Sequence, residues 1–437
     1  MTQTTRNETH RLSPPSGSAG ARAMPPTSVE GDLRFEDRPF LRWRDRLLAW
    51  KLARADGWTD DAFVSLVDAL DRAVAVIDGR GFRATPLVRV PGHDLTGTLY
   101  MKDETRGVAG THHARHLFGR LLALEVRGAT RERPLVVAGE PALAVAAAVL
   151  AAAARRSLQV YMREGTPADV VKRLSDLGAF VSLCPPVDGR DPCPVALREA
   201  MRRGALSLAC PGLDEGLAPT GAETLGWEIA SELEGVALDH VFVQVHRGVL
   251  AKALARSLGQ AVARGSLPYR PRVHMVQLRG ASPLATRYEL VAQELDSALG
   301  LGPATPRPDD TSDAAVAFRL RRADRIAASF DDPTLQRALR QIVRHPHQFL
   351  RMWDNAGRKA LEEDETLGDW LGVVTAMLES GGVPVLVEDA LVDEPSTLGL
   401  AGYLALAPTG RLVPTAIDAD GEPTSRSSTS LVVLSAE

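Results

Sequence analysis

Lysine is scarce in this sequence of 437 residues, since only five of its 51 basic residues are lysines. Chemistry that depends on a lysine amine, such as formation of an imine with an aldehyde, therefore has few places to occur. The five positions are Lys51, Lys102, Lys172, Lys252 and Lys359.

Cysteine is rarer still, with three residues at Cys184, Cys193 and Cys210. An odd number with irregular spacing fits neither a disulfide framework nor a zinc site, so we expect reduced thiols. Cys184 and Cys193 stand nine residues apart on either side of the turn PPVDGRDP. That spacing by itself indicates neither zinc binding nor redox chemistry.

The sequence also lacks a dominant charge and a long apolar run. Its formal net charge is −4, so no global field attracts nucleic acid or an anionic membrane. The alanine-rich run ALAVAAAVLAAAARR ends in two arginines, which is not typical of a membrane span. The N-terminus has no apolar core of a signal peptide. We therefore expect a cytoplasmic protein with no nucleic-acid or membrane partner.

A regular alternation of apolar strands and helical runs is present instead. Strand-like runs such as PLVVAG, SLQVYM, HVFVQV and RVHMVQL are separated by longer helical runs. This alternation predicts an α/β fold with mostly parallel sheets flanked by helices. Residues 1–34 are rich in Ser, Thr, Pro and Gly, which predicts a disordered tail. The segments 299–312 and 418–430 read as surface loops or linkers.

The segment LYMKDETRGVAGTHHARH, residues 99–116, carries a family likeness. It resembles the cofactor-lysine segment of fold-type II pyridoxal-phosphate enzymes, the tryptophan synthase β-like family, and above all that of threonine synthases. The motifs ATPLVRV, VVAGEPALAVA, GAETLGWEIASEL, DHVFVQVHRGVL and VQLRGASPL follow the same order as in the family. The resemblance implies a small domain, 128–210, inserted into a large domain made of 35–127 and 211–437.

The resemblance also implies pyridoxal phosphate as cofactor, but the sequence departs from the family where the cofactor is held. His113 stands at the position of the lysine that forms the imine, and an imidazole forms no stable imine. Glu140 replaces an asparagine and has no amide donor. The glycine-rich phosphate loop reads VHRGVL, in which His246 and Arg247 add bulk beside the retained Gly248. The cofactor-binding positions implied by the resemblance are Glu140, Thr224, His246, Arg247 and Gly248.

The first functional interpretation is a degenerate family member, a pseudoenzyme without the covalent lysine. It would bind a small-molecule anion, an amino acid or a protein partner in the old cleft, as a homodimer or beside an active paralogue. The alternative is an active pyridoxal-phosphate-dependent lyase or synthase. Such an enzyme would catalyse elimination or replacement on an amino acid, with His113 or a lysine elsewhere in an adapted role.

A metal-dependent enzyme in the refitted pocket is a further alternative. His112 and His116 are four residues apart, so one helix face could present both. Glu140 and His246 come from loops expected at the same pocket. Two histidines and one carboxylate form a known type of metal site. The sequence leaves these interpretations open.

Overall fold

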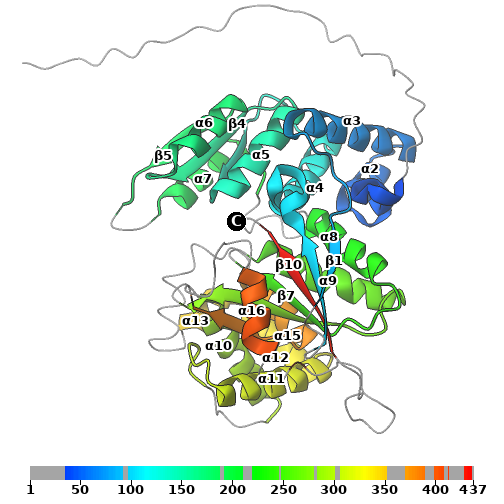
Figure 1. Ribbon diagram of the computed structural model, residues 1–437. Coiled ribbons are helices and arrows are strands. Elements are labelled where there is room, and N and C mark those ends of the chain that lie inside the picture. Colours follow the sequence, from blue (N-terminus) through cyan, green and yellow to red (C-terminus); the bar gives the residue numbers. More distant parts are fainter. Residues whose placement is uncertain are drawn as a thin grey trace, which may run out of the picture. The chain divides into compact units, whose positions relative to one another are not determined.

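Figure 1 shows the computed structural model of the chain. The structure describes residues 35–91, 97–187, 191–209, 219–245, 248–279, 283–300, 306–351, 370–388, 398–407, 412 and 428–435. The predicted tail, 1–34, lies outside the described residues, and so do His246 and Arg247.

In the described part of the chain the strands form two sheets, one of six strands and one of four. The six-stranded sheet has the order β1-β2-β10-β7-β8-β9. Only the pairing of β1 with β2 is antiparallel, and the others are parallel. Its strands are β1 (Leu87–Val90), β2 (Thr98–Asp103), β7 (His240–Gln244), β8 (Arg272–Leu278), β9 (Pro384–Val387) and β10 (Thr429–Leu434).

The four-stranded sheet has the order β5-β4-β3-β6, and all of its pairings are parallel. Its strands are β3 (Leu135–Ala138), β4 (Leu158–Arg163), β5 (Phe180–Cys184) and β6 (Leu206–Ser207). All four lie within 128–210, the segment that the resemblance implies as an inserted domain. The boundaries of that domain stay a prediction, because contacts group residues 35–437 as one compact unit.

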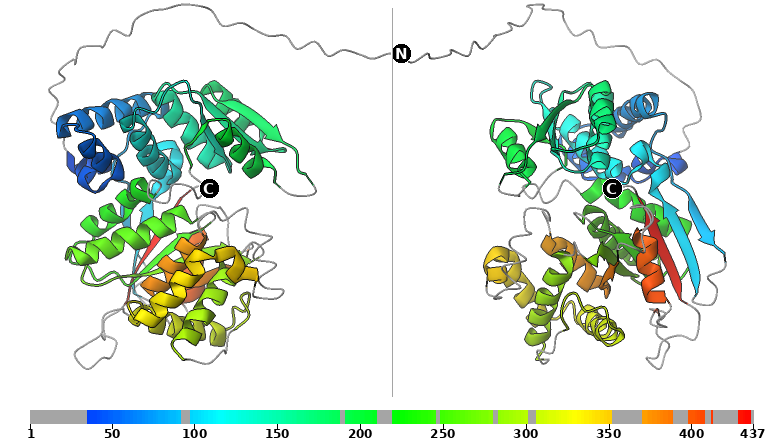
Figure 2. Two further views of the ribbon diagram at one scale, coloured as in Figure 1. Left: turned by 180° about the vertical axis from the view of Figure 1, so that it is seen from behind. Right: turned by 60° about the vertical axis from the view of Figure 1, so that its left-hand side comes forward.

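Helices cover both sheets, as Figure 2 shows for the six-stranded sheet from two further sides. The helices up to residue 202 are α1 (Pro39–Arg42), α2 (Leu48–Ala55), α3 (Asp60–Asp78), α4 (His113–Val126), α5 (Pro141–Ala153), α6 (Ala168–Asp176) and α7 (Cys193–Arg202). The later helices are α8 (Pro219–Glu232), α9 (Val249–Ala263), α10 (Pro283–Ala298), α11 (Asp313–Ala328), α12 (Pro333–Arg344), α13 (Pro346–Arg351), α15 (Trp370–Ser380) and α16 (Leu398–Leu406). None of the described helices is both long and apolar enough to cross a membrane.

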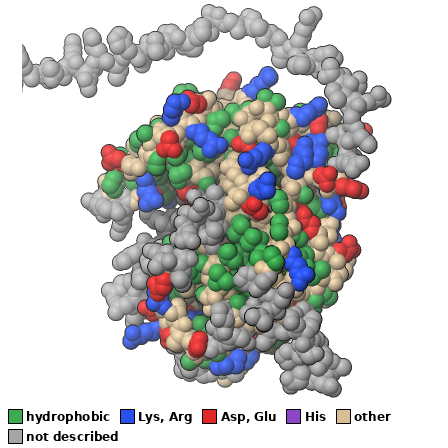
Figure 3. Space-filling view, viewed as in Figure 1, with side chains coloured by type: hydrophobic (Ala, Val, Ile, Leu, Met, Phe, Trp, Pro, Cys, Tyr) green, Lys and Arg blue, Asp and Glu red, His purple; other side chains and the backbone are tan. Residues whose placement is uncertain are grey.

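The strands are apolar because helices bury them. Every residue of β3 and β7 is buried, as parallel sheets covered on both faces require. Acidic and basic side chains are interspersed on the face shown in Figure 3, which agrees with the small net charge. The α/β fold with mostly parallel sheets is thus confirmed.

The position of β10 departs from the prediction. The sequence predicted no strand after residue 387, and 418–430 was predicted to be a surface loop or linker. In the structure Thr429 and Ser430 begin a strand that pairs with both β2 and β7, so that part of the loop prediction is wrong. Residues 418–427 lie outside the described residues. The prediction failed because the run TSLVVL is short and follows a stretch rich in Ser and Thr. Whether such a run becomes a buried strand depends on its pairing with other strands.

Two glycines set the distance between α4 and α8. A Cβ atom at Gly119 would lie 2.7 Å from the Cα atom of Gly221, and a Cβ atom at Gly221 would lie 2.2 Å from the Arg115 carbonyl oxygen. A side chain at either position would therefore push the two helices apart. Their close approach brings Arg115 against the polar side of α8.

Candidate functional site

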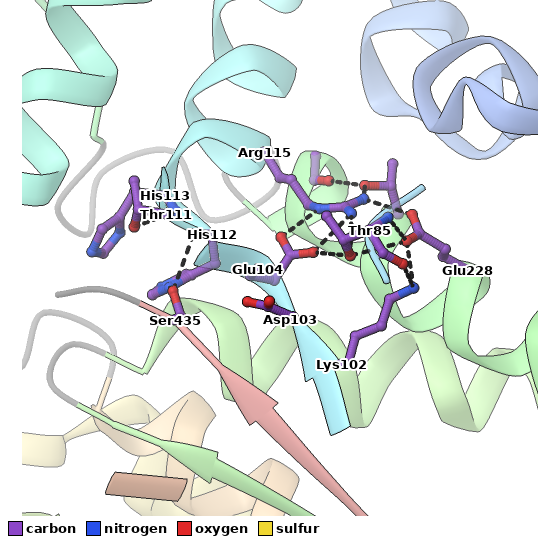
Figure 4. A network of polar contacts seen from close by, with 12 residues as sticks. Thr85, Lys102, Asp103, Glu104, Thr111, His112, His113, Arg115, Glu228 and Ser435 are labelled. Carbon is purple, nitrogen blue, oxygen red and sulfur yellow. Dashed lines mark hydrogen bonds and ion pairs between the residues drawn. The ribbon is translucent and has the colours of Figure 1, made fainter. Parts of the chain in front are cut away.

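The site is built at the carboxyl end of the six-stranded sheet. After β2 the chain passes through two short 3-10 helices, Glu104–Arg106 and Val108–Gly110, and enters α4 at His113. Because β10 runs parallel to β2, its end reaches the same edge. Ser435, just after β10, accepts a hydrogen bond from the His112 backbone N–H at 3.1 Å, and its Oγ lies 2.5 Å from His112 Nδ1 (Figure 4).

His113 and Glu140 lie in contact. The Nε2 atom of His113 is 3.3 Å from Oε1 of Glu140, and the two side chains are 8% and 16% exposed. His113 is the first residue of α4, and Glu140 occupies the N-cap position of α5, just before Pro141. The positions that the resemblance assigns to the lysine and the asparagine therefore face each other, with an acid opposite a base.

The neighbouring histidines belong to the same cluster. The ring centroids of His112 and His113 are 4.1 Å apart, and those of His113 and His116 are 5.7 Å apart. All three residues are buried. Among the residues that the structure describes, no group of three or more His, Cys, Asp or Glu side chains is placed to hold a metal ion. His246, the fourth predicted ligand, lies outside the described residues.

Burial controls the protonation of His112. It lowers the His112 pKa from 6.5 to about 4, although the negative charge of Glu140 acts in the opposite direction. His112 is therefore neutral at pH 7. The sequence did not indicate Ser435 as the partner of His112, because this contact follows only once β10 is recognised as a strand.

The low pKa of His112 predicts a loss of stability in weak acid. Below about pH 6.5 the unfolded chain binds a proton at His112, while the folded chain stays neutral down to about pH 4. The free energy of unfolding should therefore fall by about 3 kcal/mol across this interval and level off below it. Urea unfolding at a series of pH values measures this loss.

The matched control is His112→Asn, which keeps a polar partner for Ser435 but does not titrate. Its stability should depend less on pH, although buried His274, whose pKa burial also lowers, titrates in both proteins. Equal pH dependence of the two proteins would contradict the assignment to His112.

A buried ionic network lies beside this cluster (Figure 4). Arg115 Nε is 2.7 Å from Glu104 Oε2, and Arg115 Nη1 is 3.0 Å from Glu228 Oε2. Lys102 Nζ is 2.6 Å from Glu228 Oε1, is 2.6 Å from Glu232 Oε2, and donates to the Thr85 carbonyl at 2.7 Å. The network ties β2 and the start of α4 to α8.

The charges of this network compensate one another. Burial alone would raise the pKa of Glu228, but Arg115 and Lys102 hold it below its ordinary value. Thr224 belongs to the same network, because its hydroxyl accepts from Arg115 Nη1 at 3.2 Å and donates to the Gly221 carbonyl at 2.7 Å. The hydrogen bonds of Thr224 thus position Arg115, and its cofactor-binding role stays a prediction.

Of the three phosphate-loop positions implied by the resemblance, His246, Arg247 and Gly248, the structure describes Gly248. This glycine precedes α9 with a φ of 78°, a conformation that favours glycine. A Cβ atom there would lie 2.3 Å from Cγ2 of Val373. Packing against α15 thus requires glycine at this position whether or not a phosphate binds.

At the start of α4 the described residues offer no amine to which pyridoxal phosphate could attach covalently. The start of α4 offers an imidazole, and the amine of Lys102 is fully buried among carboxylates. Lys172 lies on an exposed face of α6 and pairs with Asp176. Glu140 adds a carboxylate where the resemblance implies an amide donor.

Comparison with known proteins places the fold and the site in context. A family model described as pyridoxal-phosphate dependent enzyme matches residues 80–352. The chain belongs to the pyridoxal-phosphate dependent enzyme family. Both His113 and Glu140 fall inside the matched segment. Family membership implies pyridoxal phosphate as the cofactor and confirms the fold-type II prediction.

Solved structures of this family share the fold. The fungal L-serine ammonia-lyase from Rhizomucor miehei has a TM-score of 0.51 and 17% identity, over 80% of this chain and 93% of that chain. An O-ureido-L-serine synthase has a TM-score of 0.50 and 14% identity, over 83% of this chain and 90% of that chain. A comparison with curated proteins finds no match. The closer likeness to threonine synthases stays a prediction.

Proposed function

We propose that this chain is a degenerate member of the pyridoxal-phosphate dependent enzyme family that binds a small ligand non-covalently at the start of α4. The observation that carries the proposal is the contact between His113 and Glu140. By the resemblance these two positions differ from the family, and here they hold a base and an acid that face each other.

The ligand class that this pair favours is a small zwitterion or polar acid, such as an amino acid. A carboxylate can accept from an amino group, and an imidazole can donate to a carboxylate or accept from an ammonium group. Both side chains are nearly buried, so a hydrogen bond to a ligand there competes little with water. Arg115 does not take part, because Glu104 and Glu228 already hold its guanidinium.

Borohydride reduction tests the absence of covalent chemistry. The protein incubated with pyridoxal phosphate and then reduced should carry no more pyridoxyl group at Lys252 or Lys102 than at exposed Lys172, which reports unspecific reaction. An excess of adduct at Lys252 or Lys102 would contradict the proposal. It would instead favour the alternative, an active lyase or synthase in which another lysine holds the cofactor.

Thermal melts with amino acids, and separately with free pyridoxal phosphate, test ligand binding. A ligand present at about 100 times its dissociation constant adds about 2.7 kcal/mol to the free energy of unfolding. The variant Glu140→Gln should lose most of this stabilisation. Exposed Glu199, which pairs with Arg202 on the surface of α7, offers the matched control Glu199→Gln. Equal stabilisation of both variants would place the ligand elsewhere.

A further inference from the structure

Cys184 and Cys193 are separated along the chain but meet in the fold. Cys184 is the last residue of β5, and Cys193 is the first residue of α7. Cys193 is buried in a small apolar cluster beneath α7, and Cys184 packs against that cluster. Both side chains border this one cluster, and the Cys184 thiol is one of the groups that raise the pKa of Cys193. Both are free thiols in the structure, so the fold supplies the proximity that the sequence spacing did not indicate.

We propose that Cys184 and Cys193 form a reversible disulfide that links the end of β5 to the start of α7. The oxidant would be a low-molecular-weight disulfide of the glutathione type. A disulfide needs Cα atoms roughly 4.4–6.8 Å apart, and both cysteines pack at the same small cluster. Only eight residues separate the two cysteines along the chain, so the disulfide would close a short loop.

The surroundings of the two thiols differ and set the order of the reaction. Burial, and then a hydrogen bond to Asp191, raise the pKa of Cys193 and keep it protonated. Asp191 also accepts from the Cys193 backbone N–H at 2.9 Å. Cys184 is half-buried, and its Sγ lies 3.7 Å from the Ser182 carbonyl oxygen. An oxidant therefore reaches Cys184 first.

The exchange then proceeds in two steps. The Cys184 sulfur, as a thiolate, attacks one sulfur of the small disulfide, forms a mixed disulfide and releases one thiolate of the oxidant. The Cys193 sulfur then attacks Cys184 Sγ and expels the second thiolate of the oxidant. The proton of the Cys193 thiol passes to Asp191 and on to solvent. Two protein thiols are oxidised to one disulfide, and the small disulfide is reduced to two thiols.

The bond would fix an edge of the four-stranded sheet. β5 is an edge strand that pairs with β4 alone, and α7 packs mainly on β3, β4 and β6. The disulfide would therefore tie this edge strand directly to the start of α7.

Mass spectrometry of the full chain carrying Cys210→Ser tests the proposal. This background removes the third thiol, which lies outside the described residues. After treatment with oxidised glutathione and alkylation, the chain should lose two hydrogen atoms and carry no alkyl group. The peptides of Cys184 and Cys193 should be cross-linked, and reduction should restore both thiols. Glutathione that stays attached to Cys184 after the treatment would overturn the proposal. A Cys193 thiol that still reacts with the alkylating reagent would overturn it too.

Two single variants in that background test the order of attack. With Cys193→Ser, glutathione should accumulate on Cys184, because no second thiol displaces it. With Cys184→Ser, buried Cys193 should stay unmodified in the folded protein. The reverse pattern would overturn the assignment of Cys184 as the residue attacked first.

Discussion

Replacement of Glu228 by glutamine should cost the folded chain roughly 3–5 kcal/mol, because removal of one partner from a buried ion pair leaves uncompensated charge behind. Glu228 accepts from Lys102, from Arg115 and from the Thr85 backbone N–H, and its side chain is 2% exposed. The amide keeps the shape of the side chain but removes its charge. Urea unfolding measures the loss, and a chain of ordinary stability of about 5–15 kcal/mol could fail to fold at all.

The matched control is Asp176→Asn on α6. Asp176 also pairs with a lysine, Lys172, at 2.5 Å, but the side chains of this pair are 75% and 63% exposed. Exposed pairs contribute about 0–1 kcal/mol, so this variant should unfold almost as the parent does. Similar losses in both variants would show that the buried network does not hold α4, β2 and α8 together.

The double variant His113→Lys, Glu140→Asn should change covalent capture of pyridoxal phosphate from none to a measurable fraction of the chains. The lysine supplies the amine at the start of α4, and the asparagine restores the amide donor implied by the resemblance. His113→Lys alone should capture less, because Glu140 would pair with the new ammonium group and keep it charged. Borohydride reduction followed by mass spectrometry should map the pyridoxyl group to position 113.

Substitutions in the predicted phosphate loop extend this experiment. Adding His246→Gly and Arg247→Gly should raise the affinity further, because bare backbone presents N–H groups to a phosphate. Arg106→Lys, which places a new amine on an exposed part of the preceding 3-10 helix, is the control for unspecific reaction. If the control reacts as much as the double variant, position 113 is not where the family's lysine stood.

The sequence predicted the alternating core of this fold well, for a physical reason. Strands such as β3 and β7 are buried on both faces, so apolar runs identify them without knowledge of their neighbours. All residues of β10 but the last are buried, yet these six residues follow a polar stretch and carry too weak a local signal for prediction. Its place was decided by two strands far away along the chain.

The candidate site was predictable only in part. The resemblance pointed to His113 and Glu140, and the structure brings them into contact. Residue spacing could not reveal Ser435 beside His112, nor the thiol of Cys193 beside Cys184, because both contacts join elements that only the fold brings together. The resemblance named Thr224 as a cofactor-binding position, but the contact of Thr224 with Arg115 depends on the close approach of α4 and α8 at two glycines.

The place of β10 has a consequence for synthesis on the ribosome. β2 and β7 leave the exit tunnel long before β10, and until it arrives each lacks its neighbour on one side. Unpaired strand edges attract other chains, and nascent domains form roughly in the order of synthesis. The four-stranded sheet, whose strands all come from residues 135–207, can form early. The six-stranded sheet must wait for its last strand, so a nascent chain that stalls before residue 429 exposes two open edges.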